Sequence, residues 1–157
     1  MKKTDWKRLL LCLAIPLGVG GLSALVSGGM DGYGYLRQPP LSPPGWVFPV
    51  VWSVLYLLMG YASYRVLTSK AGNIEKKTAL TLYGIQLALN FLWSPVFFEF
   101  HWYLAAFCIL VAMWAVIFRT IKAFSLTDEI AGDMLIPYIL WVTFAGYLNF
   151  GVYFLNR

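Results

Sequence analysis

Charge is scarce in this sequence. Only 12% of its 157 residues are charged, whereas 60% are hydrophobic. A soluble domain carries about a quarter charged residues, so this composition excludes a protein that folds in water and indicates one that folds in lipid.

The residue types of conventional catalysis and metal binding are also sparse. His101 is the single histidine, and it falls in a short segment between two apolar runs, where we expect it to be solvated. The sequence has no nucleophile motif, phosphate-binding loop or cluster of metal ligands, and no acidic or basic residue in the middle of an apolar run. We therefore expect no metal site and no conventional catalytic constellation.

Cysteine occurs only twice, at Cys12 and Cys108, both inside apolar runs. The spans predicted below place these thiols near opposite membrane faces, too far apart for a disulfide. We expect both to be buried and unpaired.

Long apolar runs, in contrast, are abundant. A transmembrane helix needs about 20 mainly apolar residues, and five segments qualify, at about residues 9–28, 46–64, 79–98, 103–121 and 130–155. Lipid cannot satisfy open backbone groups, and the alternation of barrel strands is missing, so each segment should be helical. The predicted fold class is an all-α membrane protein, one domain of five transmembrane helices. The first run could instead be a signal peptide, but it exceeds the roughly 7–15 apolar residues of such a segment, so we expect a span.

The net charge of +5 follows the predicted spans rather than one continuous stripe, so we expect no nucleic-acid partner. Only Arg37 and Arg157 flank one side of the predicted bundle. The other ten basic residues flank the opposite side: Lys2, Lys3, Lys7, Arg8, Arg65, Lys70, Lys76, Lys77, Arg119 and Lys122. Because cytoplasmic loops carry the excess of Lys and Arg, this asymmetry predicts a cytoplasmic N-terminus and an external C-terminus in the cell membrane.

Aromatic residues form the second excess, with seven Trp, ten Tyr and eleven Phe. Trp and Tyr collect at the membrane interface, but Trp52, Trp93 and Trp141 fall a turn or more inside their spans. Gln86 and Asn90 share a helix face with Trp93, and buried amides should point into the bundle. A second stripe in the last span contains Tyr138, Trp141, Ala145, Leu148 and Asn149. The two stripes indicate either a pocket for a planar apolar ligand or helix packing joined by amides, and the pattern leaves both open.

Two further features bear on binding. The connection from Gly29 to Gly45 is long, as binding loops and lids often are, and its Arg37 could hold a ligand carboxylate or pair with Asp31. Small residues recur at four-residue spacing at Gly20, Ala24 and Gly28, which favours close helix contact within the bundle or across a dimer.

Three runs occur in order along the chain: PPGWVFPVVWSVLYLLMGYASY from Pro43, LALNFLWSPVFF from Leu87 and PYILWVTFAGYLNF from Pro137. Together they resemble the TspO/MBR family of tryptophan-rich sensory proteins and translocator proteins, also called peripheral benzodiazepine receptors. The resemblance implies a five-helix bundle, often a homodimer, with no permanently bound cofactor. It also implies binding of porphyrins and other tetrapyrroles, and of isoquinoline and benzodiazepine drugs. The residues that match the family's pocket are Tyr33, Trp52, Asn90, Trp93, Trp141, Ala145 and Leu148.

The resemblance implies three alternative functions. The first is porphyrin binding with light-dependent oxidative breakdown of protoporphyrin, in which the oxidisable indoles of Trp52 and Trp141 would be the catalytic groups. The others are transport of tetrapyrroles across the membrane and ligand-dependent regulation. The family's sterol-binding members have a tyrosine soon after the position of Asn149, where this chain has Phe150, so the resemblance does not extend to sterol binding.

Overall fold

The computed structural model describes residues 3–28 and 33–157, which form α-helices and one 3-10 turn and contain no strand. The elements are α1 (Trp6–Val26), η1 (Tyr33–Tyr35), α2 (Val47–Leu67), α3 (Asn73–Phe98), α4 (Tyr103–Thr127), α5 (Glu129–Asp133) and α6 (Ile136–Leu155). Helices α1 to α4, together with α5 and α6 taken as one, are long and apolar enough to give five membrane spans. The prediction of an all-α bundle of five transmembrane helices is confirmed.

The helices extend beyond the apolar segments that predicted them. Helix α3 begins at Asn73 rather than near residue 79, and α4 ends at Thr127 rather than near residue 121. Apolar length measures the part of a helix inside lipid, whereas polar turns continue past it. The added first turn of α3 carries Glu75, whose charge complements the helix dipole.

The fifth span is broken after its first turns. Asp128 caps α5 by accepting a hydrogen bond from the Ala131 backbone N–H at 3.0 Å. Met134 and Leu135 then interrupt the helix, just before Pro137 in the first turn of α6. Proline has no backbone N–H and is tolerated in a first turn, so its position fits the start of a new helix.

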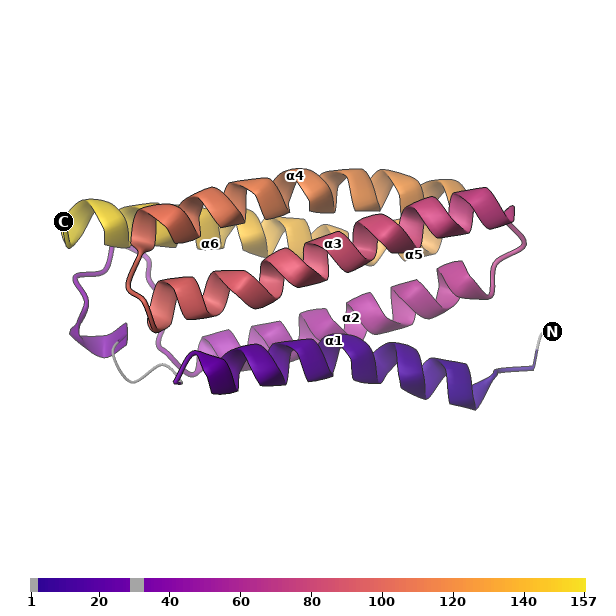
Figure 1. Cartoon of the computed structure of the whole chain (residues 1–157), viewed down its shortest axis with the longest axis horizontal. Helices are drawn as coiled ribbons and strands as arrows, with labels where there is room; N and C mark the ends of the chain where they lie inside the picture. The colour runs from indigo at the N-terminus through magenta and orange to yellow at the C-terminus, as the bar shows by residue number, and fades with distance from the viewer. Residues whose placement is uncertain (1–2, 29–32) are drawn as a thin grey trace.

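The chain termini lie at opposite ends of the bundle, as an odd number of spans requires (Figure 1). The N-terminus lies at the same end as the α2–α3 and α4–α5 connections, and we call this the basic end. The C-terminus lies at the other end with η1 and the α3–α4 connection, and we call this the loop end.

Helix α1 is held by different neighbours along its length. Toward the basic end it packs on α2 at Gly60, where an added Cβ would lie 2.7 Å from the Cys12 carbonyl oxygen and 2.8 Å from the Leu13 Cα. Toward the loop end, Ser23 donates a hydrogen bond to the Phe91 carbonyl of α3 at 2.8 Å, and Ser27 donates one to Ser94 at 2.8 Å. Helix α1 therefore packs closely on α2 at Gly60 and is joined to α3 by hydrogen bonds toward the loop end.

The two cysteines differ in burial. Cys12 is a buried free thiol, as expected, but Cys108 is exposed on the surface of the bundle. The expectation of burial for Cys108 was wrong because an apolar residue of a membrane helix can face lipid rather than protein.

Candidate functional site

A cavity of about 580 Å³ lies between α1, α2 and α3 in the half of the bundle nearest the loop end. This volume falls within the roughly 300–1,000 Å³ of small-molecule sites. Apolar and aromatic side chains dominate the lining, and none of the described lining residues is acidic, basic, His, Cys or Met. The cavity therefore suits an apolar ligand held by shape and stacking.

The wall from α1 is built of small residues, among them Gly20, Gly21 and Ala24. An added Cβ at Gly20 would collide with the ring of Tyr56 from α2. Any side chain at position 20 would have to displace the tyrosine ring, which lies directly against the α1 backbone.

The wall from α2 and α3 is aromatic and centres on Trp52. The Trp52 ring stacks on Tyr56 with centroids 5.6 Å apart and an interplanar angle of 26°. It also lies 6.5 Å from Trp93 and, edge-on, 6.2 Å from Tyr138. These contacts hold the Trp52 indole in a fixed orientation beside the cavity.

A chain of buried hydrogen bonds runs from the cavity into the bundle. The Tyr56 hydroxyl donates to Asn90 Oδ1 at 2.9 Å, and Asn90 Nδ2 donates to the Tyr138 oxygen at 2.8 Å. The Tyr138 hydroxyl in turn donates to Gln86 Oε1 at 2.5 Å. Asn90 therefore lines the cavity and also joins α2, α3 and α6. The hydrogen bonds are helix packing joined by an amide, and binding of a planar ligand stays a prediction.

A second amide joins α3, α4 and α6 at the loop end. The Trp93 indole N–H donates to Asn149 Oδ1 at 2.9 Å, and Asn149 Nδ2 donates to the Tyr103 carbonyl at 2.8 Å. Trp93 is thus fixed at its nitrogen while its ring forms part of the cavity wall.

Tyr33, Ala145 and Leu148 are buried but do not line this cavity. The Tyr33 ring packs edge-on against Phe48 with centroids 5.1 Å apart, and Leu148 belongs to the same cluster. Burial raises the pKa of the Tyr33 phenol above its ordinary value.

Trp141 lies on the other side of α2 from the cavity. It lines an apolar groove of about 520 Å³ between α2 and α6, and its ring centroid is 5.8 Å from that of Phe48. Its buried indole N–H has no hydrogen-bond partner among the described residues. The structure therefore brings Trp52, Asn90 and Trp93 together, and leaves Phe48 as the link from their cavity to Tyr33 and Trp141.

Arg37 ties the first loop to the C-terminus through its backbone. Its N–H donates to Asn156 Oδ1 at 3.0 Å, and Asn156 Nδ2 donates back to the Arg37 carbonyl at 2.8 Å. The alternative partner Asp31 lies outside the described residues. His101 is exposed, as expected, with Nδ1 3.3 Å from the Tyr103 hydroxyl.

Comparison with known proteins decides the family. The model of the TspO/MBR family matches residues 10–155 of the chain. The chain belongs to the TspO/MBR family. It is 40% identical to "Protein CrtK" of Rhodobacter capsulatus over 79% of this chain and 78% of that protein. It is 37% identical to "Tryptophan-rich protein TspO" of Chlorobaculum tepidum over 94% and 95%. It is also 37% identical to the human "Translocator protein" over 90% and 85%.

Sequence reasoning missed several residues that shape the cavity in this TspO/MBR protein. Phe48, Trp52 and Tyr56 are spaced four residues apart and share one face of α2, a signal that could have added both neighbours of Trp52. The four-residue spacing of Gly20 and Ala24 predicts close helix contact. Their role in forming a cavity wall depends on where α1 and α3 meet, which the spacing does not give.

Proposed function

We propose that this TspO/MBR protein binds a porphyrin in the cavity between α1, α2 and α3. The supporting observation is the composition of the two walls, with Trp52 and Trp93 on one side and the small residues of α1 on the other. A planar macrocycle can stack on the indoles only if the facing wall carries no bulky side chain. Isoquinoline and benzodiazepine ligands, which are also flat and apolar, would compete for the same space.

We further propose that the bound porphyrin is broken down in light. A metal-free porphyrin is a photosensitiser, and its excited state can take one electron from the Trp52 indole. This transfer gives a porphyrin radical anion and an indole radical cation. The radical anion adds dioxygen, and the adduct returns one electron to the indole radical cation, which restores the indole. The O–O bond of the resulting neutral peroxide then breaks together with a carbon–carbon bond of the macrocycle and leaves two carbonyl groups, so dioxygen is the terminal oxidant. In this proposal the protein supplies a donor at stacking distance and a site that orients the macrocycle, so no acid–base pair is needed.

Trp141 has a conditional role in this proposal. Phe48 lines the cavity and also contacts Trp141. A ligand in the cavity can reach the Trp141 indole only if the Phe48 ring turns aside. Trp52 is therefore the primary electron donor, and Trp141 a second donor.

The close packing of α1 and α2 favours binding and chemistry over the alternative of transport. At Gly60 the two backbones touch, on the basic-end side of the cavity. A transporter would have to separate them to pass a macrocycle through the bundle. A regulatory sensor would use the same cavity, so we regard sensing as the alternative that shares the site.

We propose that the protein resides in the cell membrane with the basic end in the cytoplasm, and that two copies form a homodimer. The basic residues lie in the connections of that end and at the adjoining helix ends, and this excess is the basis for the orientation.

The deciding experiment follows the absorption spectrum of protoporphyrin mixed with the purified protein, in light and in the dark. We expect binding in both conditions and loss of the porphyrin bands in light only, faster than with porphyrin alone. Binding of protoporphyrin without faster loss of its absorption bands would contradict light-dependent breakdown and support a binding or sensing role. No saturable binding would refute the porphyrin site itself.

A further inference from the structure

A second cavity, of about 750 Å³, opens at the basic end of the bundle. We call it the basic-end pocket, and it shares no lining residue with the aromatic cavity. Its walls come from the segment before α1, the end of α2, the α2–α3 turn and the start of α5. Two carboxylates, Asp5 and Asp128, line it together with five basic side chains: Lys3, Arg8, Arg65, Lys70 and Lys76.

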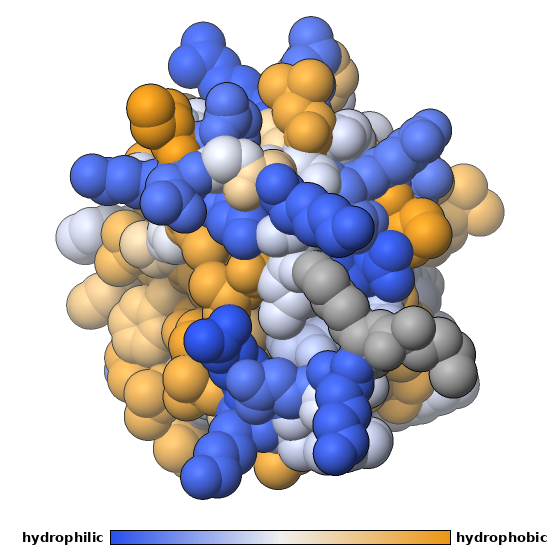
Figure 2. Space-filling model, turned by 90° about the vertical axis from the view of Figure 1, so that its right-hand side faces the viewer, coloured by the Kyte–Doolittle hydropathy of each residue, from blue (hydrophilic) through white to orange (hydrophobic). Residues whose placement is uncertain are grey.

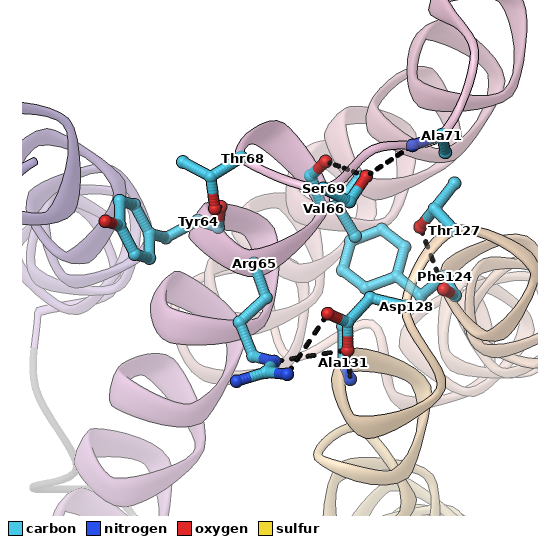
Figure 3. A network of polar contacts seen from close by, with 10 residues as sticks. All are labelled: Tyr64, Arg65, Val66, Thr68, Ser69, Ala71, Phe124, Thr127, Asp128 and Ala131. Carbon is cyan, nitrogen blue, oxygen red and sulfur yellow. Dashed lines mark hydrogen bonds and ion pairs between the residues drawn. The ribbon is translucent and has the colours of Figure 1, made fainter. Parts of the chain in front are cut away.

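Both carboxylates are already paired. Asp5 contacts Arg8 at 3.3 Å and caps α1 by accepting from the Arg8 backbone N–H at 3.2 Å. Figure 3 shows Arg65 of α2 reaching Asp128, which it contacts at 3.1 Å, while Asp128 also accepts from Ala131. The pocket therefore keeps a surplus of three positive charges.

The unpaired charges belong to three lysines. Within residues 3–28 and 33–157, Lys3, Lys70 and Lys76 form no ion pair. Lys76 donates one hydrogen bond, to the Leu67 carbonyl at 3.2 Å, and a lysine ammonium has three donors. Donors therefore remain for an anion.

Hydrogen bonds and an ion pair connect the segments that form the walls of the basic-end pocket. The Asp5 backbone N–H donates to the Tyr64 hydroxyl at 3.0 Å, which fixes the segment before α1 against α2. In the α2–α3 turn, Ser69 donates to the Val66 carbonyl at 2.8 Å and accepts from the Ala71 N–H at 3.4 Å (Figure 3). The ion pair of Arg65 and Asp128 joins α2 to α5. All the walls are thus tied to one another.

The surroundings suit an amphiphile. Figure 2 shows hydrophilic side chains gathered over this end of the bundle, with hydrophobic ones on its flanks. Trp6 and Leu10 near the start of α1 are 67% and 63% exposed, as residues that contact lipid would be. Basic pockets between transmembrane helices at the cytoplasmic face are typical sites for anionic lipid headgroups, and lysine is a common phosphate ligand.

From this geometry we infer that the basic-end pocket binds a phosphate-bearing anion, supplied either by the headgroup of an anionic phospholipid or by a soluble phosphate compound. The inference is independent of the porphyrin proposal, because it rests on the opposite end of the molecule.

The test compares two double variants with the same change of charge. Lys70→Gln/Lys76→Gln removes two lysines that line the pocket. Lys7→Gln/Lys77→Gln removes two that lie at the same end but do not line it. Native mass spectrometry of the detergent-purified protein would measure binding of phosphatidylglycerol against phosphatidylcholine, and calorimetry would measure binding of inorganic pyrophosphate.

We expect the wild-type protein and the Lys7/Lys77 variant to retain phosphatidylglycerol in preference to phosphatidylcholine. The Lys70/Lys76 variant should bind it about tenfold or more weakly, because each basic residue near an anionic surface contributes about a fivefold gain and the variant lacks two. Pocket-dependent binding of pyrophosphate without a preference for phosphatidylglycerol would support the site and assign it to a soluble phosphate compound.

Equal losses of phosphatidylglycerol affinity in the two double variants would overturn the inference, because the anionic lipid would then be attracted by the total charge of the basic end and not bound by the pocket. Absence of phosphatidylglycerol preference and of pyrophosphate binding in the wild type would also overturn it. Lys70→Arg/Lys76→Arg keeps both charges and should retain binding. If it bound as weakly as the glutamine variant while its melting temperature stayed at the wild-type value, charge would not be the cause and the inference would fail.

Discussion

Gly20 and Tyr56 fit together across the α1–α2 interface, with the tyrosine ring occupying the space that a side chain at Gly20 would need. The same ring supports Trp52 and donates its hydroxyl to Asn90. Gly20 of α1 thus leaves the space that sets the position of the aromatic wall on α2.

We expect Gly20→Ala to weaken porphyrin binding. The added methyl group must displace the Tyr56 ring, which breaks or strains its hydrogen bond to Asn90 and tilts Trp52. Overpacking of this kind costs about 1–3 kcal/mol, which would lower affinity by about fivefold or more if it falls on the bound state. Titration of tryptophan fluorescence with protoporphyrin would measure it.

Gly18→Ala is the matched control, because a Cβ at Gly18 would meet no atom within 4 Å. Equal affinity in the two variants would show that the contact with Tyr56 does not shape the site.

Replacing Trp52 by Phe should separate binding from chemistry. Phenylalanine keeps most of the apolar area but is much harder to oxidise than indole. We expect near-normal binding of protoporphyrin, loss of most light-dependent breakdown, and an unchanged dark control. Trp141→Phe should have the smaller effect on the rate, because Phe48 stands between Trp141 and the cavity.

Trp102→Phe serves as the control, since this side chain is 61% exposed at the loop end and does not line the cavity. If the Trp52/Trp141 double variant degraded porphyrin at the wild-type rate, both residues would be removed from the mechanism. Binding and breakdown that fell together would indicate a packing role instead.

Metal-free protoporphyrin and haem should bind with similar affinity. Axial ligation of haem iron needs His, Cys, Met or Tyr. Among the described residues that line the cavity, Tyr56 is the one of these types, and its hydroxyl donates a hydrogen bond to Asn90. Parallel titrations with the two ligands, followed by the haem absorption spectrum, provide the measurement. A strong preference for haem with a low-spin ligated spectrum would contradict binding by stacking alone.

The ion pair of Arg65 and Asp128 should stabilise the protein at neutral pH and lose its effect in acid. Burial alone would raise the pKa of Asp128, but the hydrogen bonds from Arg65 and Ala131 outweigh it and hold the pKa below its ordinary value. Because the folded-state pKa is the lower one, the stabilisation is fully present above the unfolded value of about 3.9 and disappears as pH falls through the folded value.

Asp128→Asn should therefore lower the melting temperature by a similar amount from pH 5 to 8, and the difference from wild type should shrink below about pH 4. We expect a cost of roughly 1 kcal/mol, since both side chains are partly exposed. Asparagine still caps a helix, whereas Asp128→Ala should cost about 1 kcal/mol more. A melting-temperature difference between wild type and Asp128→Asn that grew as the pH fell would contradict a lowered pKa of Asp128 in the folded protein.

Tags on the two termini should be reached from opposite sides of the membrane, the N-terminal tag from the cytoplasm and the C-terminal tag from outside. The excess of basic residues at one end is the reason. Labelling of both tags from the same side would contradict the count of five spans, and a reversed result would contradict the orientation alone.

The spans could be predicted because the length of an apolar run is itself the physical requirement for crossing lipid. The inward direction of Gln86, Asn90 and Asn149 could be predicted for a similar reason, since an amide facing hydrocarbon is costly. The packing of neighbouring helices, which sequence spacing does not give, determines the cavity or groove that each tryptophan lines. Trp52 and Trp141 both lie inside apolar runs, yet Trp52 lines the cavity between α1, α2 and α3 whereas Trp141 lines the groove between α2 and α6. Cys108 likewise shows that apolar character does not distinguish a protein-facing position from a lipid-facing one.

The hydrogen-bond chain through Tyr56, Asn90, Tyr138 and Gln86 has an evolutionary consequence. Loss of one hydroxyl would leave an amide without a partner inside the membrane, a state that costs more than replacing donor and acceptor together. Substitution of one of these four residues alone should therefore cost more stability than substitution of several of them together. Among related sequences, we expect the four positions to vary together as a block, with intermediates rare.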